Sequence, residues 1–186
     1  MNNENIVISC ILKCFIYFFF ERRIRLSKAH INNFSTIIYS IINGIDNNVL
    51  VERPQISTWL EIGASTSTLD LDLPASFSNY GKKSVHLFAP GFKINSTIPE
   101  NKYEALSGTS MACPTVAGVA ALAWSQMPSM SAKQIKKILQ KTAIDYQGTA
   151  VKLPGSTVEV PFLDLSEAGA VVNAFSATQM VLWVKE

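Results

Sequence analysis

The stretch SGTSMACPTVAGVAALAW, from Ser107 to Trp124, constrains the fold of this chain more than any other. It carries no charged residue, and small and apolar residues follow one another after Ser110 without leaving a polar face. A helix with this pattern is typical of a buried position in a core. The sequence predicts such a helix from Ser110 to about Gln126, buried on all sides. Pro114 is expected in its first turn, where a missing N–H has no intrahelical partner.

The residues around this helix predict an α/β fold. The runs TWLEIGAS and SVHLFAPG are short, apolar and end in turn residues, which is typical of buried strands. The segment INSTIPENKYEALSG indicates a further strand and turn. After the buried helix, PSMSAKQIKKILQKTA predicts an amphipathic helix. Ser131 and Gln134 have the spacing of a capping box at its start.

Length and composition favour one globular domain and exclude some partners. The chain has 186 residues, of which 48% are hydrophobic, enough for a sizeable core. Its formal charge is +2, with no basic stripe, so we expect no nucleic-acid partner. Cys10 and Cys14 lack the second pair of ligands that a zinc site needs, so no metal site is predicted.

Residues 1 to 50 differ in composition from the rest of the chain, because they are apolar and rich in Asn. We expect them to form an irregular or helical segment outside the catalytic fold. Within them, residues 6–20 are apolar apart from Ser9 and Lys13. This stretch is shorter than the roughly twenty residues of a membrane span and lacks the flanks of a signal peptide. Residues 6–20 could still act as a weak membrane anchor, although we do not expect the chain to have a membrane partner. Its localisation is left open.

Ser110 has two interpretations. Serine is a favoured helix N-cap, whose oxygen accepts a backbone N–H. Alternatively, Gly108 and Thr109 shape a tight turn that presents the Ser110 hydroxyl on a rigid helix, where the helix dipole favours a developing anion. The second arrangement suits acyl transfer, provided that a base lies within hydrogen-bond reach of the hydroxyl.

The motif GTSMACPTVAGVAAL resembles the nucleophile-serine motif of the subtilisin-like serine endopeptidases, and most closely that of their bacterial branch. The resemblance continues upstream through WLEIGAST and ASFSNYGKKSVHLFAPGFKINSTIPENKYEALSGTS and downstream through LSEAGAVVNAFSA. It implies that Ser110 is the nucleophile, that Gly108 and Thr109 shape the turn before it, and that Met111 is its helical neighbour. It also implies a parallel sheet sandwiched by helices.

The rest of the family's catalytic triad is not recognisable. The resemblance implies an Asp and a His upstream of Ser110, but the two histidines, His30 and His86, lack the family context, and we identify no general base. His30 is interpreted as a surface histidine. His86 falls within a predicted strand, where relatives more often carry Asp, and is interpreted as structural. The amide that binds the oxyanion in the family is unassigned, with Asn43 as a weak candidate.

The sequence therefore predicts the C-terminal half of a subtilisin-like catalytic domain at residues 51–179, with a short tail at 180–186. We predict a truncated serine endopeptidase that retains Ser110 and is inactive alone. The family resemblance implies that the substrate is a polypeptide. Two alternatives stay open: a piece of a split protease completed by a complementary N-terminal fragment, and a non-catalytic remnant that binds a peptide or a partner. No cofactor is predicted; calcium is common in the family but cannot be assigned here.

Overall fold

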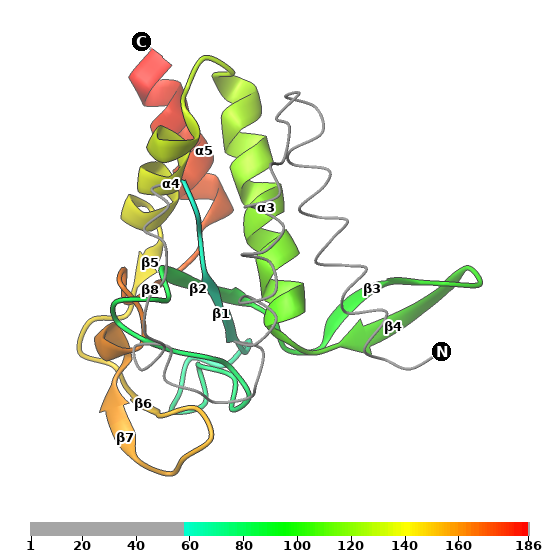
Figure 1. Cartoon of the computed structure of the whole chain (residues 1–186), viewed down its shortest axis with the longest axis vertical. Coiled ribbons are helices and arrows are strands. Elements are labelled where there is room, and N and C mark those ends of the chain that lie inside the picture. Colours follow the sequence, from blue (N-terminus) through cyan, green and yellow to red (C-terminus); the bar gives the residue numbers. More distant parts are fainter. Residues whose placement is uncertain (1–57, 186) are drawn as a thin grey trace, which may run out of the picture.

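The computed structural model describes residues 58–185, which form one sheet, two hairpins, three α-helices and one short 3-10 helix (Figure 1). The strands are β1 (Ile62–Ser65), β2 (Leu87–Pro90), β3 (Ile94–Ile98), β4 (Lys102–Leu106), β5 (Ile144–Asp145), β6 (Ala150–Lys152), β7 (Glu159–Pro161) and β8 (Ala170–Val171). The helices are α3 (Thr109–Gln126), α4 (Ala132–Lys141), α5 (Ala174–Lys185) and the short 3-10 helix η2 (Phe162–Asp164).

The central sheet confirms the α/β class. Its strand order is β1-β2-β8-β5, in which β1, β2 and β8 are parallel and β5 is antiparallel to β8. Ile62 pairs with Leu87 and Ser65 with Pro90, so the two strands predicted from TWLEIGAS and SVHLFAPG lie side by side in register. Parallel strands are buried on both faces, which explains their continuous apolar runs.

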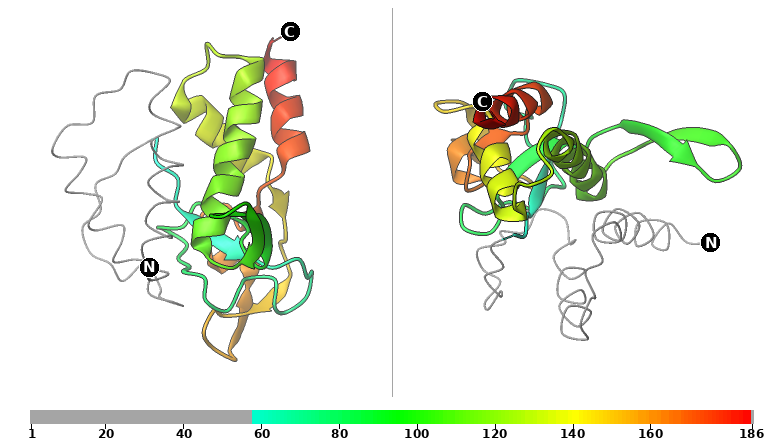
Figure 2. Two further views of the ribbon diagram at one scale, coloured as in Figure 1. Left: turned by 90° about the vertical axis from the view of Figure 1, so that its right-hand side faces the viewer. Right: turned by 90° about the horizontal axis from the view of Figure 1, so that it is seen from above.

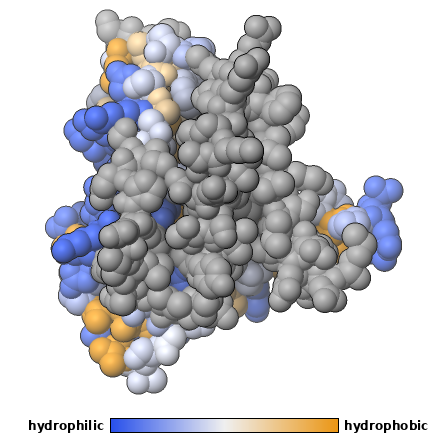
Figure 3. All heavy atoms as spheres, in the orientation of Figure 1, coloured by the Kyte–Doolittle hydropathy of each residue, from blue (hydrophilic) through white to orange (hydrophobic). Residues whose placement is uncertain are grey.

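Helices α3, α4 and α5 cover one face of the sheet (Figure 2). Ala64 of β1 and Leu87 of β2 pack there against Ala112 and Val116 of α3. The opposite face is covered in the described part of the chain by η2, the β6–β7 hairpin and loops, which bury the rings of Phe88 and Phe162 at a centroid distance of 5.1 Å. The hydrophobic residues at the lower end of the view in Figure 3 lie in the region of β6 and β7.

Helix α3 differs from its prediction in two respects. It is not buried on all sides, because one face is exposed along Gly118, Ala121, Leu122 and Ser125. Nor does Pro114 lie in the first turn, because the helix begins at Thr109 and places Pro114 at its sixth residue. Its ring therefore removes the hydrogen bond that the Ser110 carbonyl would accept within a regular helix.

Helix α4 confirms its predicted start. The Ser131 side chain accepts a hydrogen bond from the backbone N–H of Gln134, and the Gln134 side chain accepts one from the Ser131 N–H, so the capping box is complete. The helix buries Ile135, Ile138 and Leu139 against the core. Helix α5 packs on the core through Ala177 and Val181 and continues past residue 179, so residues 180–185 of the proposed tail are helical.

The β3–β4 hairpin corresponds to the predicted strand and turn in INSTIPENKYEALSG. It extends from the body on the side of α3 that faces away from α4 and α5 (Figures 1 and 2). Every residue from Asn95 to Thr97 and from Lys102 to Ala105 is exposed, so both faces of the hairpin meet solvent. Its second strand leads directly into the turn that precedes α3.

Candidate active site

The turn before α3 is attached to the carboxyl end of β2. The Gly108 N–H donates a 2.8 Å hydrogen bond to the carbonyl of Gly91, the residue that follows β2. The Ser107 hydroxyl accepts a 2.9 Å hydrogen bond from the backbone N–H of Lys93. In open α/β sheets, ligands bind at the carboxyl ends of the strands. The turn therefore places Ser110 at the edge of the sheet where a functional site is expected.

Gly91 permits the close approach of this turn to the sheet. A Cβ atom at this position would lie 2.7 Å from the Cβ of Ala64, 2.8 Å from the carbonyl oxygen of Gly108 and 3.1 Å from the Cβ of Ala112. Two of these three atoms belong to the turn and to α3. The strand end, the turn and the helix thus meet where only a glycine fits without movement of the backbone.

Ser110 is the second residue of α3 and is 7% exposed. The N-cap is Gly108, with no side-chain capping bond, so the interpretation of Ser110 as the cap is wrong. Within the described part of the chain, neither the Ser110 hydroxyl nor its backbone N–H has a hydrogen-bond partner. Met111 next to it is buried, and its N–H donates a 3.0 Å hydrogen bond to the Gly108 carbonyl.

This arrangement holds part of what acyl transfer requires. A hydroxyl and an adjacent free N–H lie in the first turn of an 18-residue helix, whose N-terminal dipole favours negative charge. Such a donor can stabilise the oxyanion of a tetrahedral intermediate. A serine hydroxyl is a weak nucleophile, however, until a neighbouring base takes its proton.

The structure does not bring His86 to Ser110. His86 lies directly before β2 rather than within it, at the amino end of the strand. Its Nδ1 accepts a 2.9 Å hydrogen bond from the Glu61 N–H, and its Nε2 lies 3.9 Å from a carboxylate oxygen of Glu167. The Ser110 turn is attached beyond the other end of β2, and four strand residues span about 13 Å. The contacts of His86 thus join the residues that precede β1 and β2 and include Glu167.

His30 and Asn43, the other predicted candidates, lie outside the described residues. Thr109, which the resemblance assigns to the turn before Ser110, is the first residue of α3 and is half-buried. Sequence reasoning missed the contributions of Gly91 and Ser107 to the site. The signal for Gly91 was its position directly after an apolar strand, which can mark a close backbone approach.

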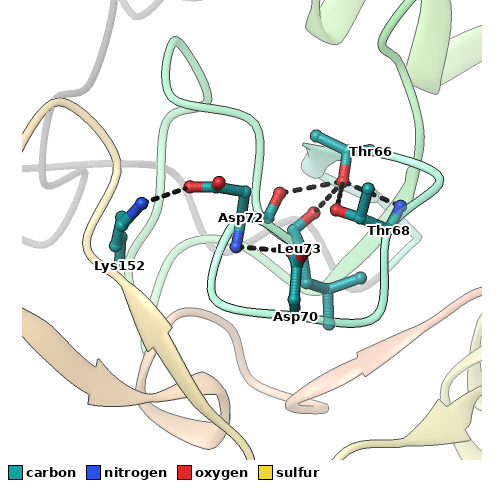
Figure 4. Close-up of polar contacts among 6 residues, drawn as sticks. All are labelled: Thr66, Thr68, Asp70, Asp72, Leu73 and Lys152. Carbon is teal, nitrogen blue, oxygen red and sulfur yellow. Dashed lines mark hydrogen bonds and ion pairs between the residues drawn. The ribbon is translucent and has the colours of Figure 1, made fainter.

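The loop that follows β1 is held by hydrogen bonds among its own residues and by an ion pair with Lys152 of β6 (Figure 4). The Thr66 hydroxyl donates a 2.8 Å hydrogen bond to the Asp72 carbonyl, and Lys152 pairs with the Asp72 carboxylate at 3.0 Å. The Asp72 N–H donates to the Asp70 carboxylate at 2.9 Å, and this bond is the main cause that lowers the pKa of Asp70.

Two further properties of the described part bear on ligands and membranes. Among residues 58–185, no group of three or more His, Cys, Asp or Glu side chains is placed to hold a metal ion. In the same range, no helix has the length and apolar character required to cross a bilayer. The apolar stretch at residues 6–20 lies outside the described residues.

The sequence model of the subtilase family matches residues 27–167 of this chain. The chain therefore belongs to the subtilase family, as the GTSMACP motif predicted. The match begins upstream of residue 51, where the catalytic part was predicted to start, and it includes Asn43.

Curated relatives and solved structures agree with this membership. The thermostable alkaline protease of Halalkalibacterium halodurans is 52% identical over 69 residues, which are 37% of this chain and 19% of that protein. Subtilisin-like protease 2 of Plasmodium falciparum is 50% identical over 72 residues, 37% of this chain and 5% of that protein. The A-subunit of an AB5 toxin from E. coli has the same fold, with a TM-score of 0.57 and 24% identity over 75% of this chain and 48% of the toxin chain.

The maturation protease PagA adds a structure of higher identity, with a TM-score of 0.51 and 28% identity over 72% of this chain and 45% of PagA. The chain thus spans about half the length of the solved subtilase structures that it matches, and a smaller share of the curated relatives.

Proposed function

We propose that this chain is the serine-bearing half of a subtilisin-like serine endopeptidase, with Ser110 as the nucleophile, and that it does not hydrolyse peptide bonds by itself. Gly108, Thr109 and Met111 support the nucleophile as the turn and the first residues of α3. The substrate class that family membership implies is a polypeptide. Asn43 remains a candidate for the oxyanion-binding side chain, because the family match includes its segment.

The observation that carries this proposal is the environment of Ser110. Ser110 is buried at the carboxyl end of the sheet, and its hydroxyl has no hydrogen-bond partner within the described residues. The one histidine that the structure describes is bonded at the opposite end of β2. In subtilisin, which belongs to the same family, removal of the histidine base has been measured to slow turnover about a millionfold. A comparable loss is expected for Ser110 without a base.

The alternative of a remnant that binds a peptide at the sheet edge has less support. The outer edge of β1 is occupied by the chain itself: the Ala75 N–H donates to the Ala64 carbonyl, and the Thr66 N–H donates to the Leu73 carbonyl. The Ala64 N–H in turn donates to the Ser78 hydroxyl at 2.8 Å. An extended peptide would have to displace this loop before it could pair with β1.

Labelling with a fluorophosphonate tests the proposal, because the reagent modifies activated serines. We expect the purified chain to remain largely unlabelled under conditions that label the thermostable alkaline protease to completion. Intact-protein mass spectrometry measures the labelled fraction, and the Ser110→Ala variant supplies the background. Stoichiometric labelling of Ser110 in the chain alone would show that a base is already present and would contradict the proposed inactivity.

A further inference from the structure

His86 is joined to Glu61 by two reciprocal hydrogen bonds at the amino ends of β1 and β2. The His86 backbone N–H donates a 2.9 Å hydrogen bond to the Glu61 carbonyl, and the His86 Nδ1 accepts a 2.9 Å hydrogen bond from the Glu61 N–H. Both bonds lie next to the pair formed by Ile62 and Leu87, with which the β1–β2 ladder begins. A side-chain nitrogen therefore takes the acceptor role that a backbone carbonyl has within a ladder.

The hydrogen bond to Nδ1 depends on the protonation state of the imidazole ring. A ring nitrogen that accepts a hydrogen bond carries no proton, so the ring is neutral and its proton lies on Nε2. Protonation would place a hydrogen on Nδ1, facing the Glu61 N–H. The His86 side chain is 18% exposed, so water has little room to replace the lost acceptor. A donor left without an acceptor in such surroundings is destabilising.

Charged groups on neighbouring segments act on this equilibrium in opposite directions. Glu167, which precedes β8, has a carboxylate oxygen 3.9 Å from the His86 Nε2 and favours the protonated ring. The Glu167 side chain is 58% exposed, however, so solvent screens this attraction. The ammonium group of Lys136 on α4 interacts with the carboxylates of Glu167 and Glu61 and offsets part of their negative charge. Loss of the bond between Nδ1 and the Glu61 N–H therefore outweighs the attraction to Glu167.

We propose that His86 is a pH-sensitive switch, which holds the amino ends of β1 and β2 together while its ring is neutral and releases the Glu61 N–H when the ring binds a proton. The switch is independent of the proposed function, although β2 carries the turn before Ser110 at its other end. A histidine in an unfolded chain has a pKa of about 6.5. Below that pH the unfolded chain binds a proton that the closed pair excludes, so stability from this group is present at higher pH and is lost as the pH falls.

Urea unfolding of the full chain between about pH 8 and about pH 5 tests this switch. The matched variant is His86→Asn, because the amide oxygen of asparagine can accept the Glu61 N–H and does not titrate. We expect the unfolding equilibrium constant of the wild type, divided by that of His86→Asn, to rise below about pH 6.5 by up to about tenfold per pH unit. Both chains keep His30, so its titration cancels in this ratio. A ratio that stays constant, or that falls with the pH, overturns the switch.

Amide hydrogen exchange measured by NMR gives a local readout in the wild-type chain that needs no variant. We expect the protection factor of the Glu61 N–H to fall by at least about tenfold from about pH 8 to about pH 5. The control is the Val172 N–H, which donates a 2.9 Å hydrogen bond to the Phe88 carbonyl, an acceptor that does not titrate. Its protection factor is expected to change less, because release of Glu61 is local. Equal changes at Glu61 and Val172 would overturn the switch.

Discussion

At the scale of single residues, two glycines near the start and in the middle of α3 have opposite surroundings. Gly91 lies where β1, the turn and α3 converge, and a Cβ atom there would lie within 3.1 Å of three neighbouring atoms. Gly118 is the tenth residue of α3, and a Cβ atom there would meet nothing within 4 Å. Glycine is therefore required at position 91. At position 118 it only weakens the helix within the described structure.

We predict that Gly91→Ala destabilises the chain by about 1–3 kcal/mol, the usual effect of overpacking a close contact. Two of the three close atoms are the Gly108 carbonyl oxygen and the Cβ of the buried Ala112 near the start of α3, and neither can move aside as the end of a flexible side chain would. Urea unfolding followed by circular dichroism measures the change.

Gly118→Ala is the control for this prediction. It is expected to stabilise the chain by about 0.5–1 kcal/mol, because alanine is the better helix former and nothing obstructs its methyl group. Equal effects of the two substitutions would contradict the conclusion that Gly91 is required for the close contact between the end of β2 and the turn before α3.

At the scale of elements, α4 is joined to the segment before β1 by Lys136. Its ammonium group donates a 2.7 Å hydrogen bond to the carbonyl of Trp59. Partial burial lowers the pKa of Lys136, while the nearby carboxylates of Glu167 and Glu61 act in the opposite direction. The charged form is thus disfavoured in the folded chain relative to the unfolded chain.

This lowered pKa predicts a pH dependence of stability. Between the folded pKa of Lys136 and its ordinary value of 10.5, the unfolded chain binds more protons than the folded chain, so stability from this group increases as the pH rises. We expect the difference in unfolding free energy between wild type and Lys136→Met to grow in favour of wild type from neutral to alkaline pH. Guanidinium titrations at several pH values measure this difference, and a gap that shrinks as the pH rises would contradict it.

At the scale of the whole molecule, α5 exposes large apolar side chains. Phe175 is 70% exposed and Trp183 is 72% exposed, and the hydropathy view shows hydrophobic residues at the surface near the C-terminal end of this helix (Figure 3). Between Ala174 and Val184, only Ala177 and Val181 are fully buried. Exposed apolar patches of this kind favour self-association.

We predict that Phe175→Ser combined with Trp183→Ser reduces self-association in sedimentation velocity and changes the unfolding free energy by no more than about 0.5 kcal/mol. Both side chains are largely exposed, so their removal costs little packing. Val181→Ser serves as the comparison and is expected to cost about 2 kcal/mol or more, because it places a hydroxyl at a fully buried position. A comparable loss of stability in both variants would show that the exposed side chains pack in solution.

Local patterns in the sequence predicted the main elements of the fold and the helix that begins next to Ser110, the proposed nucleophile. The apolar runs, the capping box at Ser131 and the turn before Ser110 depend on neighbours within a few residues, so these features are encoded locally. The resemblance of the GTSMACP motif predicted the family, which the match over residues 27–167 confirms.

Three features were decided only by the tertiary structure. They are the side of α3 that is covered, the close contact of Gly91 with the turn before α3, and the position of His86 at the end of β2 opposite to Ser110. These features depend on contacts between residues far apart in the sequence. Hydropathy and periodicity indicate which side chains can be buried. The packing of distant segments then determines which of them are buried and which side chains come into contact.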